Sequence, residues 1–457
     1  MKRLVISEHG RIWKGAGNGE EVSVERVWLD DRRYNLLQRF DRVYARGGQN
    51  IFTWYADHVK AMQWVGVIQL GQVQIEILPK IDDQDSPGNH LGQARQNLLY
   101  MLAVAGDIPV RLRDIARLTV RKAPLNETLS GIFARHLLAE LLRGSERAYI
   151  AREKNLRTFR GRLIINRHVL HNGGHRERFY CRYDEFSDDT VMNRVFKATC
   201  KILLTTTTTP ATQDSLRHCM LMLDGVRDEL ITANHFKQVQ FTRQNDRFLE
   251  IFNFCRLIHS GLSPNASSGG ERTYSLLFDM NAVFERFIAA FIKKQVMKRL
   301  PGHEIFPQAK HNRLYLMESS TGKGILQMAP DILIRDPAGK HLVIDTKWKR
   351  LKPTNTGNQG NVSSGDLYQL YAYTHRYDCH QSFLLYPQVP GVVAQDYHLF
   401  DRHDQLTDSK VGVRLVNLHR NLHSEQERVA LADELEDFIL AGFGQNNKLL
   451  AVAGGGI

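Results

Sequence analysis

The sequence predicts a protein of the α+β or α/β class in three segments. These are a β-rich region over residues 1–150, a mainly helical segment over 151–270 and an α/β core over 271–457. Short runs that alternate apolar and polar residues dominate the first segment, and helical periodicity dominates the second. The third reads helix–strand–strand–helix–strand, a pattern typical of a sheet covered by helices. With 457 residues, 42% of them hydrophobic, the chain is long enough for two or three domains.

In the first segment the clearest strands are 22–27 and 66–81, the second of these a hairpin around Gly71 and Gln72. Residues 97–105 fit either a helix or a buried strand, and residues 125–142 fit a helix.

In the middle segment, residues 193–204 and 214–230 have amphipathic helical patterns. Five threonines at 205–209 lie between them and predict a polar loop. The Ser-, Gly- and Asn-containing stretch 263–270 is the predicted linker to the third segment.

In the third segment, residues 281–300 predict a helix capped by Asp279 or Asn281. Its buried stripe consists of Phe284, Phe287, Ile288 and Phe291. Further on, residues 353–365 predict a loop that is either a moving element near the substrate or plain disorder. A strand at 381–386 follows, and residues 406–440 predict a strand and a long helix.

The most informative residues lie on two apolar runs, 332–334 and 342–344, which are joined by a turn containing Pro337 and Gly339. If this hairpin is symmetric about Ala338, Asp331 and Asp345 lie opposite each other. Their Cβ atoms would then be about 5 Å apart.

Two carboxylates this close repel each other unless a cation lies between them. Mg²⁺ suits such an all-oxygen site and keeps part of its water. Because side chains alternate along a strand, Lys347 should share the face of Asp345 while Thr346 points away. The ammonium group is then placed to orient a water or to stabilise developing negative charge. The alternative is a surface hairpin with a cross-strand charge pair.

The pattern Pro330-Asp331 … Asp345-x-Lys347 resembles the PD-(D/E)xK nuclease superfamily. Gln369 and Tyr373, four residues apart on a predicted helix, are similar to a pair in the RecB-like branch of that superfamily. The resemblance implies that Gln369 contacts substrate or metal-bound water. Tyr368 and Tyr371 on the same helix are expected to fill the core instead.

Enzymes of this superfamily often supply one more acid from a helix before the hairpin, and Glu285 is the candidate here. The alternative for Glu285 is a solvated residue in the first turn, which the helix dipole favours.

A narrower resemblance is to the McrC subunit family of McrBC-type, modification-dependent (type IV) restriction systems. It runs from about Gly66 to about Tyr386. The segments that carry it are Gly71 to Ile81, Asn97 to Leu102, Arg157 to Leu163, Cys181 to Asp189 with Asn193, and D-M-N-x-x-F-E-x-F from Asp279.

This resemblance implies a Mg²⁺-dependent endonuclease, with Mn²⁺ as a substitute ion. Asp331 and Asp345 would ligate the metal, and the backbone carbonyl of either Ile344 or Thr346 would complete the coordination. Lys347 would position the attacking water.

The implied substrate is double-stranded DNA, with methylated cytosine as the cue, in antiviral defence. The implied partner is a McrB-like AAA+ ring, a GTPase or an ATPase, which docks on residues 1–150 and is stimulated by them. Cutting both strands would require transient dimerisation of two nuclease domains.

The composition agrees with a polyanionic partner and argues against a membrane-spanning or secreted protein. The formal charge is +12, no apolar run is long enough to span a membrane, and no signal peptide is recognisable. The five cysteines include no C-x-x-C, so the chain is expected to be reduced and cytoplasmic.

Three other constellations carry no chemistry. Residues 320–324 lack the glycine and the Ser/Thr of a phosphate loop, and no G-x-S-x-G elbow is present. The histidines His168, His171 and His175 are expected in a solvated loop, because two glycines follow His171 closely.

Two rival functions stay open at this point. One is a non-catalytic adaptor that activates an AAA+ motor, and the other is a stand-alone RecB-like repair exonuclease. The intact acidic and basic set opposes the first, and the large N-terminal region opposes the second.

Overall fold

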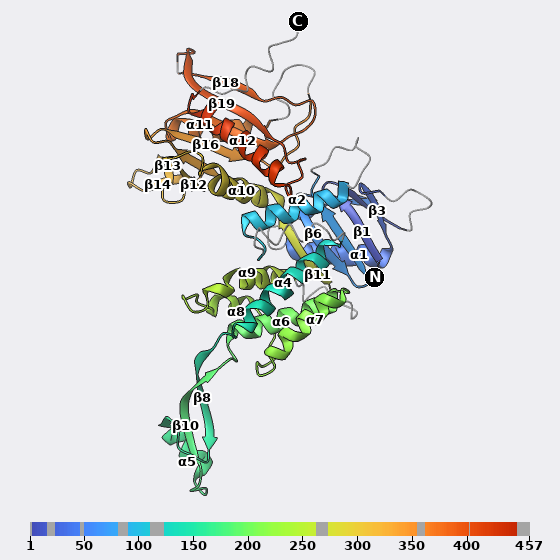
Figure 1. Ribbon diagram of the computed structural model, residues 1–457, viewed down its shortest axis with the longest axis vertical. Coiled ribbons are helices and arrows are strands. Elements are labelled where there is room, and N and C mark those ends of the chain that lie inside the picture. The colour runs from blue at the N-terminus through green and yellow to red at the C-terminus, as the bar shows by residue number, and fades with distance from the viewer. Residues whose placement is uncertain are drawn as a thin grey trace. The chain divides into compact units, whose positions relative to one another are not determined.

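The computed structural model describes residues 2–15, 23–45, 50–80, 90–109, 123–261, 273–353, 362–401 and 403–445 (Figure 1). Contacts divide the chain into two compact units. The first contains 1–107, 111–122 and 277–457, and the second contains 108–110 and 123–276. The three-segment division stays a prediction. Among the described residues, no helix combines the length and the apolar character that crossing a membrane requires.

Two four-stranded sheets have the orders β1-β7-β6-β11 and β3-β2-β5-β4, and all of their strands except β11 lie wholly in the first unit. Strands β6 and β7 form the predicted hairpin, and Gly71 turns between them with φ 58°. The strand predicted at 22–27 begins later, because residues 24–25 form a turn. The strand bounds are β1 Lys2–Ser7, β2 Arg11–Lys14, β3 Arg26–Leu29, β4 Phe52–Trp54, β5 His58–Ala61, β6 Trp64–Leu70, β7 Val73–Leu78 and β11 Thr273–Asp279.

Two helices accompany these sheets, α1 (Asp31–Ala45) and α2 (His90–Ala105), so the ambiguous segment 97–105 is helical. Asn97, from one of the motif segments, is 1% exposed. Its Nδ2 donates to the carbonyls of Leu418 and Arg420, and its Oδ1 accepts from the backbone N–H of Leu422. Asn97 therefore ties α2 to a C-terminal loop of the same unit.

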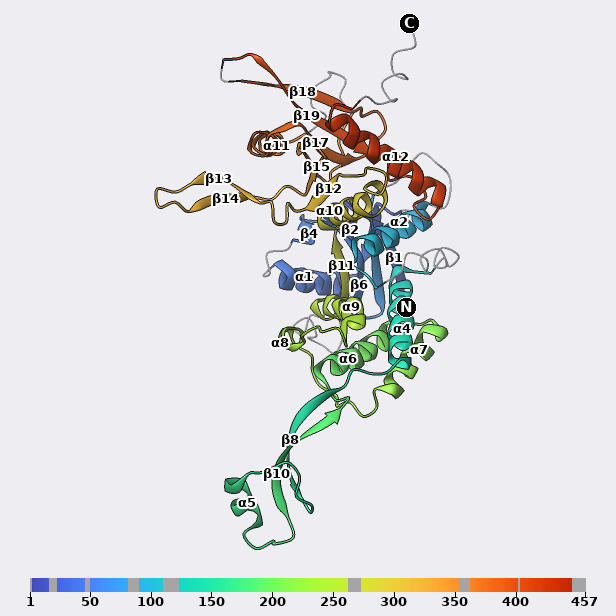
Figure 2. The same ribbon diagram turned by 60° about the vertical axis from the view of Figure 1, so that its left-hand side comes forward.

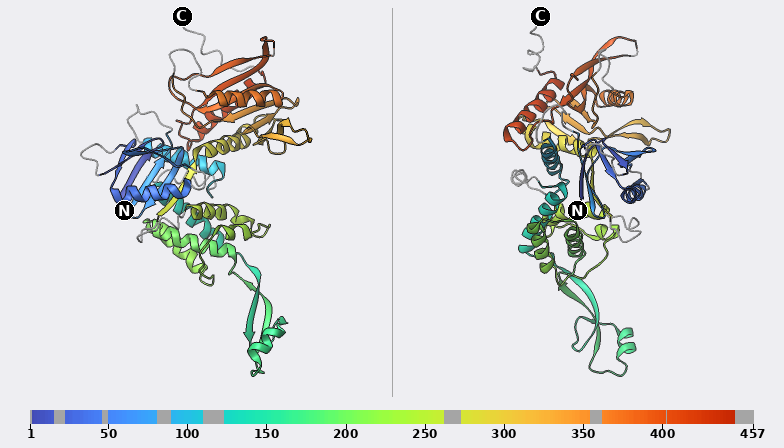
Figure 3. Two further views of the ribbon diagram at one scale, coloured as in Figure 1. Left: turned by 180° about the vertical axis from the view of Figure 1, so that it is seen from behind. Right: turned by 90° about the vertical axis from the view of Figure 1, so that its right-hand side faces the viewer.

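The C-terminal part of the first unit is a six-stranded sheet with order β12-β15-β16-β17-β19-β18. Strands β15 and β16 are antiparallel, whereas β17 is parallel to both β16 and β19. Helices α11 and α12 cover opposite faces of the sheet (Figure 3). The predicted strand at 381–386 and the predicted strand and helix within 406–440 are confirmed. The bounds are β12 Glu304–Pro307, β15 Ile332–Arg335, β16 His341–Thr346, β17 Cys379–Pro387, β18 Gln395–Phe400, β19 Leu406–Val416, α11 Ser364–Arg376 and α12 Glu425–Gly442.

Helix α10 (Met280–Phe291) begins at Asp279, whose side chain accepts a hydrogen bond from the N–H of Asn281. The predicted apolar stripe is buried, with at most 1% exposure at Phe284, Phe287, Ile288 and Phe291. The helix is shorter than the predicted 281–300, because a π-helical turn at Ile292–Val296 replaces its regular bonding.

The second unit contains a bundle of helices: α4 (Leu125–Leu142), α6 (Val191–Thr206), α7 (Pro210–Met222), α8 (Ala233–Gln238) and α9 (Leu249–Ser260). Helix α7 ends before the predicted boundary at 230. The predicted threonine loop at 205–209 is shorter, because α6 continues to Thr206. The buried Glu127 holds the rest of it, and its carboxylate accepts bonds from Thr207, Thr208 and Thr209. All five cysteines of the chain are free, and all of them are buried.

The middle segment is not mainly helical throughout. Strands β8 (Ala148–Leu156) and β10 (Phe179–Ser187) form a long antiparallel ribbon, joined by the short β9 (Arg162–Leu163) and helix α5 (Ile165–Asn172). Burial alternates along β8 and β10, which is the two-residue period of a strand and not that of a helix. His168 and His171 lie on helix α5 rather than in the predicted loop.

The predicted linker at 263–270 and most of the loop at 353–365 lie outside the described residues.

Candidate active site

The motif hairpin is formed by β15 and β16, and its register is symmetric about Ala338. Ile332 pairs with Ile344, and Arg335 pairs with His341. In the turn, the N–H of Lys340 donates to the Asp336 carboxylate, and Gly339 has a φ of 85°, which favours glycine. Continuing this register by one residue places Asp331 opposite Asp345, as predicted from the sequence.

Asp331 precedes the first ladder pair, and its carboxylate turns toward Thr346. Its Oδ2 accepts bonds of 2.7 Å from both the N–H and the hydroxyl of Thr346. Strand alternation predicted that Thr346 points away from the face of Asp345 and Lys347. Its hydroxyl nevertheless contacts Asp331, which precedes the first pair of the ladder and is not held in the pleat. Burial raises the pKa of Asp331, and the Thr346 bonds and Lys347 oppose that shift.

Asp345 is 2% exposed, at the end of β16. Its Oδ2 lies 2.6 Å from the Lys347 ammonium as an ion pair but makes no hydrogen bond of normal geometry. Burial and the nearby Asp331 raise the pKa of Asp345 to about 6, against the opposing effect of Lys347. Asp345 is thus a buried carboxylate whose Oδ2 is paired only with the Lys347 ammonium.

Lys347 shares the face of Asp345, as predicted. Its backbone N–H continues the sheet by donating to Leu385, and its ammonium group also donates to Gln369 Oε1 at 3.2 Å. Burial lowers the pKa of Lys347, but the surrounding carboxylates outweigh burial and raise the pKa above its usual value. The ammonium is therefore charged and held between two elements.

Gln369 and Tyr373 lie on one face of α11, as predicted. Gln369 Nε2 donates to the Tyr373 hydroxyl at 2.9 Å, which fixes the amide with its oxygen toward Lys347. The expectation that Tyr368 and Tyr371 fill the core is wrong: they are 74% and 43% exposed, and Tyr373 is buried instead. The helix presents its Leu370 and Tyr373 side to the sheet, which turns the other two tyrosines outward.

Glu285, on α10, lies near the hairpin. Burial and the Asp331 charge raise its pKa, so the Glu285 and Asp331 carboxylates interact. Its Oε1 accepts a 2.9 Å bond from the Gln308 side chain, and the Gln308 N–H donates to the Asp331 carbonyl. The solvated alternative for Glu285 does not describe this half-buried position.

Sequence reasoning missed Asp366. Its carboxylate lies 2.9 Å from the Lys349 ammonium and 4.0 Å from that of Lys347, and it raises the pKa of Asp345. A signal was available, because Asp366 stands three residues before Gln369 and such residues share a helix face. Gln308 had no comparable signal, since it lies in an irregular turn.

The donor set fits a hard divalent cation. Within the described ranges, no group of three or more His, Cys, Asp and Glu side chains is placed to hold a metal ion. Magnesium, however, is commonly held by one or two carboxylates and completed by water and substrate phosphate. Asp331 and Asp345 match that requirement, and the Asp345 oxygen without a hydrogen bond has spare acceptor capacity.

A buried carboxylate supports the site from the N-terminal sheets. Glu8 is 2% exposed and accepts bonds of 2.9 and 3.0 Å from the indole N–H of Trp348, the residue after Lys347. Trp348 also contacts Phe284 on α10. Burial raises the pKa of Glu8 to about 7.

We expect Glu8→Gln to stabilise the protein above neutral pH. A carboxyl group whose pKa is higher in the folded protein contributes stability below its unfolded pKa, and loses it as pH rises through about 7. The shift corresponds to roughly 3 kcal/mol. The variant should match wild type near pH 4.5 and unfold at higher temperature at pH 8. Tryptophan fluorescence reports this, because Trp13, Trp28, Trp54, Trp64 and Trp348 all belong to the first unit.

Replacement of an exposed acid of the same unit, Glu318→Gln, provides the matched control and should leave the pH dependence unchanged. If Glu8→Gln has the same unfolding temperature as wild type at every pH, then ionisation of Glu8 does not destabilise the folded protein.

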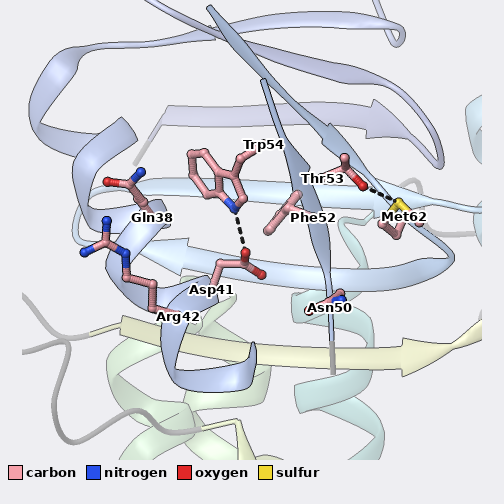
Figure 4. A pocket seen from close by; sticks show the side chains of 8 residues that line it. All are labelled: Gln38, Asp41, Arg42, Asn50, Phe52, Thr53, Trp54 and Met62. Atoms are coloured by element: carbon pink, nitrogen blue, oxygen red, sulfur yellow. Dashed lines mark hydrogen bonds between the residues drawn. The ribbon is translucent and has the colours of Figure 1, made fainter. Parts of the chain in front are cut away.

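A pocket of about 430 Å³ lies elsewhere in the first unit, between α1 and β4 (Figure 4). The Trp54 indole N–H donates to the buried Asp41 at 2.6 Å, and the Thr53 hydroxyl contacts Met62. Its lining carries a single carboxylate, so it offers no paired acids for hydrolysis. The hairpin remains the candidate active site.

Comparison with known proteins identifies a family. The family model described as McrBC 5-methylcytosine restriction system component matches residues 59–387, more than half of the chain. This stretch includes the hairpin, α10 and α11.

The relative "Type IV methyl-directed restriction enzyme EcoKMcrBC" of Escherichia coli (strain K12) is 22% identical over 341 residues. That alignment covers 71% of this chain and 92% of the relative.

Solved structures show a similar fold. A half-complex from a tetradecameric assembly of Thermococcus gammatolerans McrB AAA+ hexamers with bound McrC matches at 20% identity with a TM-score of 0.64. The match covers 96% of this chain and all of that chain.

Proposed function

We propose that this chain, which belongs to the family of McrBC 5-methylcytosine restriction system components, is the subunit that cuts DNA in such a system. The observation that carries the proposal is the convergence of Asp331, Asp345 and Lys347 on one hairpin, with Gln369 and Glu285 supplied by two helices. The reaction is hydrolysis of a phosphodiester bond in double-stranded DNA, in a core of the PD-(D/E)xK type.

Asp331 and Asp345 would hold the divalent ion, Mg²⁺ or Mn²⁺. When bound, the ion supplies Lewis acidity toward a phosphate oxygen and lowers the pKa of bound water. The side chains do the positioning. The Lys347 ammonium lies 2.6 Å from Asp345 Oδ2, where it would orient the attacking water and offset charge on the phosphorane-like transition state. The attack forms a new P–O bond and breaks the bond to the leaving oxygen, which takes up a proton.

Gln369 keeps Lys347 in place. Its amide bridges the Lys347 ammonium and the Tyr373 hydroxyl, so the ammonium is held from α11 as well as from β16. Lys349 and Arg350 follow in sequence and add positive charge suited to the DNA backbone.

The partner in this proposal is a McrB-like AAA+ ring. Its support is the fold shared with a chain from an assembly of McrB AAA+ hexamers with bound McrC. Methylated cytosine as the cue rests on the family description.

Cleavage tests the proposal. With the cognate AAA+ protein and nucleotide present, methylated plasmid should be cut with Mg²⁺ or Mn²⁺ and left intact in EDTA, and added Mg²⁺ should restore cutting. Cleavage that persists in EDTA would refute the metal-dependent site. A protein that stimulates the partner but never cuts would be the non-catalytic adaptor.

A further inference from the structure

A two-stranded hairpin projects from the sheet that carries the active site (Figure 2). Strand β13 (Leu314–Glu318) pairs only with β14 (Gly324–Met328) among the described strands. Two strands alone are marginally stable in water, so such a hairpin usually needs a covering surface.

The base of the hairpin is packed against the rest of the unit, whereas the part nearer its tip exposes apolar side chains. Met328 is buried, and the Tyr377 hydroxyl donates to its carbonyl. Farther out, five large apolar side chains are 43–58% exposed: Tyr315, Leu316, Met317, Ile325 and Leu326. Because side chains alternate along a strand, Tyr315, Met317 and the cross-strand partner Ile325 share one face of the hairpin, and Leu316 points to the other. Single exposed apolar residues are ordinary, whereas a group of three on one face is typical of a contact surface.

Positive charge borders this apolar group. Lys310, Arg313 and Lys323 lie on the hairpin and its approach, and all are exposed. Arg376 of α11 is also exposed and donates to the Tyr315 carbonyl. One acid, Glu318, lies on the strands themselves. A nucleic acid duplex carries negative phosphates on its outside and apolar base rings in its interior. An apolar group bordered by cations is complementary to that arrangement.

The hairpin is connected directly to the active site. Gln308 at its approach donates to both the Asp331 carbonyl and the Glu285 carboxylate, and the Arg313 guanidinium donates back to the Gln308 carbonyl. The base of the hairpin is therefore linked by hydrogen bonds to Asp331 and Glu285.

We propose that the β13–β14 hairpin lies in a groove of the DNA duplex beside the scissile phosphate. The proposal rests on the proposed function, since it names how that substrate is held. A strand of this length reaches roughly 16 Å. The major groove, about 12 Å wide and 8.5 Å deep, admits a two-stranded ribbon. The apolar tip meets base edges while the flanking cations meet phosphates.

Photo-crosslinking identifies the occupant. The full chain carries a benzophenone amino acid at Leu326, or at Leu406 as a control of similar exposure on another strand. It is irradiated with a 30-base-pair duplex and the AAA+ partner in EDTA. We expect a DNA adduct from position 326 only. An adduct to a second polypeptide, without DNA, would overturn the proposal.

The affinity of hairpin variants for duplex DNA tests the same contact without a crosslinking group. In an Asp345→Ala background, Met317→Ser combined with Ile325→Ser, an exposed cross-strand pair, should weaken duplex binding about tenfold. The matched control replaces Phe400 and Leu406, an exposed cross-strand pair on β18 and β19, and should bind normally.

Unchanged affinity of the hairpin variant, in a protein whose wild type cuts DNA, would refute the hairpin contact and leave the nuclease assignment standing. If the Asp345→Ala parent binds no duplex and the wild type cuts none, both proposals fail together.

Discussion

Replacing Asp345 with alanine should reduce DNA cleavage by on the order of a thousandfold or more, while stimulation of the AAA+ partner's NTPase stays at the wild-type level. The carboxylate is the most buried of the proposed ligands, and its Oδ2 makes no hydrogen bond. Losing several kcal/mol of transition-state stabilisation corresponds to a factor of this size. Plasmid cleavage and phosphate release, measured in one reaction, report the two activities separately.

Unfolding does not explain such a loss. Asp345 is ionised at a cost, because burial raises its pKa, so alanine should not lower the melting temperature. The matched control is Asp408→Ala, which removes an exposed carboxylate from β19 of the same sheet. It should cut normally. Joint loss of cleavage and NTPase stimulation in the Asp345 variant would contradict the division of labour between nuclease and adaptor.

The hairpin was predictable because its register follows from local chemistry. The turn residues fix its centre, and a symmetric pairing then places Asp331 and Asp345 opposite each other. The position of Lys347 follows from strand alternation, and that of Gln369 relative to Tyr373 follows from helix periodicity. Each of these inferences needs only a few consecutive residues.

The parts that were missed depend on distant contacts. Nothing near Glu8 in the sequence indicates that it meets Trp348, 340 positions later. The ribbon of β8 and β10 is hard to predict from the sequence because β8, AYIAREKNL, is mostly polar and half exposed, so its alternation is weak. Tyr368 and Tyr371 were placed in the core on residue type alone, whereas packing of α11 decides which tyrosine is buried.

Replacing Lys347 with methionine should reduce cleavage by about a hundred- to a thousandfold, the usual effect of removing one group that stabilises transition-state charge. The chain still folds, because methionine keeps the length and apolar stem of lysine. Lys349→Met is the matched control. Lys349 is exposed and pairs with Asp366, not with Asp345, so its loss should reduce cleavage far less.

The same variant gives a readout that does not depend on activity. Without the ammonium at 2.6 Å, the Asp345 carboxylate is left buried beside Asp331 with no charge to balance it. An uncompensated buried charge is strongly destabilising. In EDTA at pH 8, Lys347→Met should therefore melt at a lower temperature than wild type. Added Mg²⁺ should raise the melting temperature of the variant more than that of wild type, because the ion is then the only positive charge that compensates the paired acids in the folded state. If Mg²⁺ shifts both proteins equally, the ion does not bind at Asp331 and Asp345, and the two carboxylates would belong to a structural charge network instead.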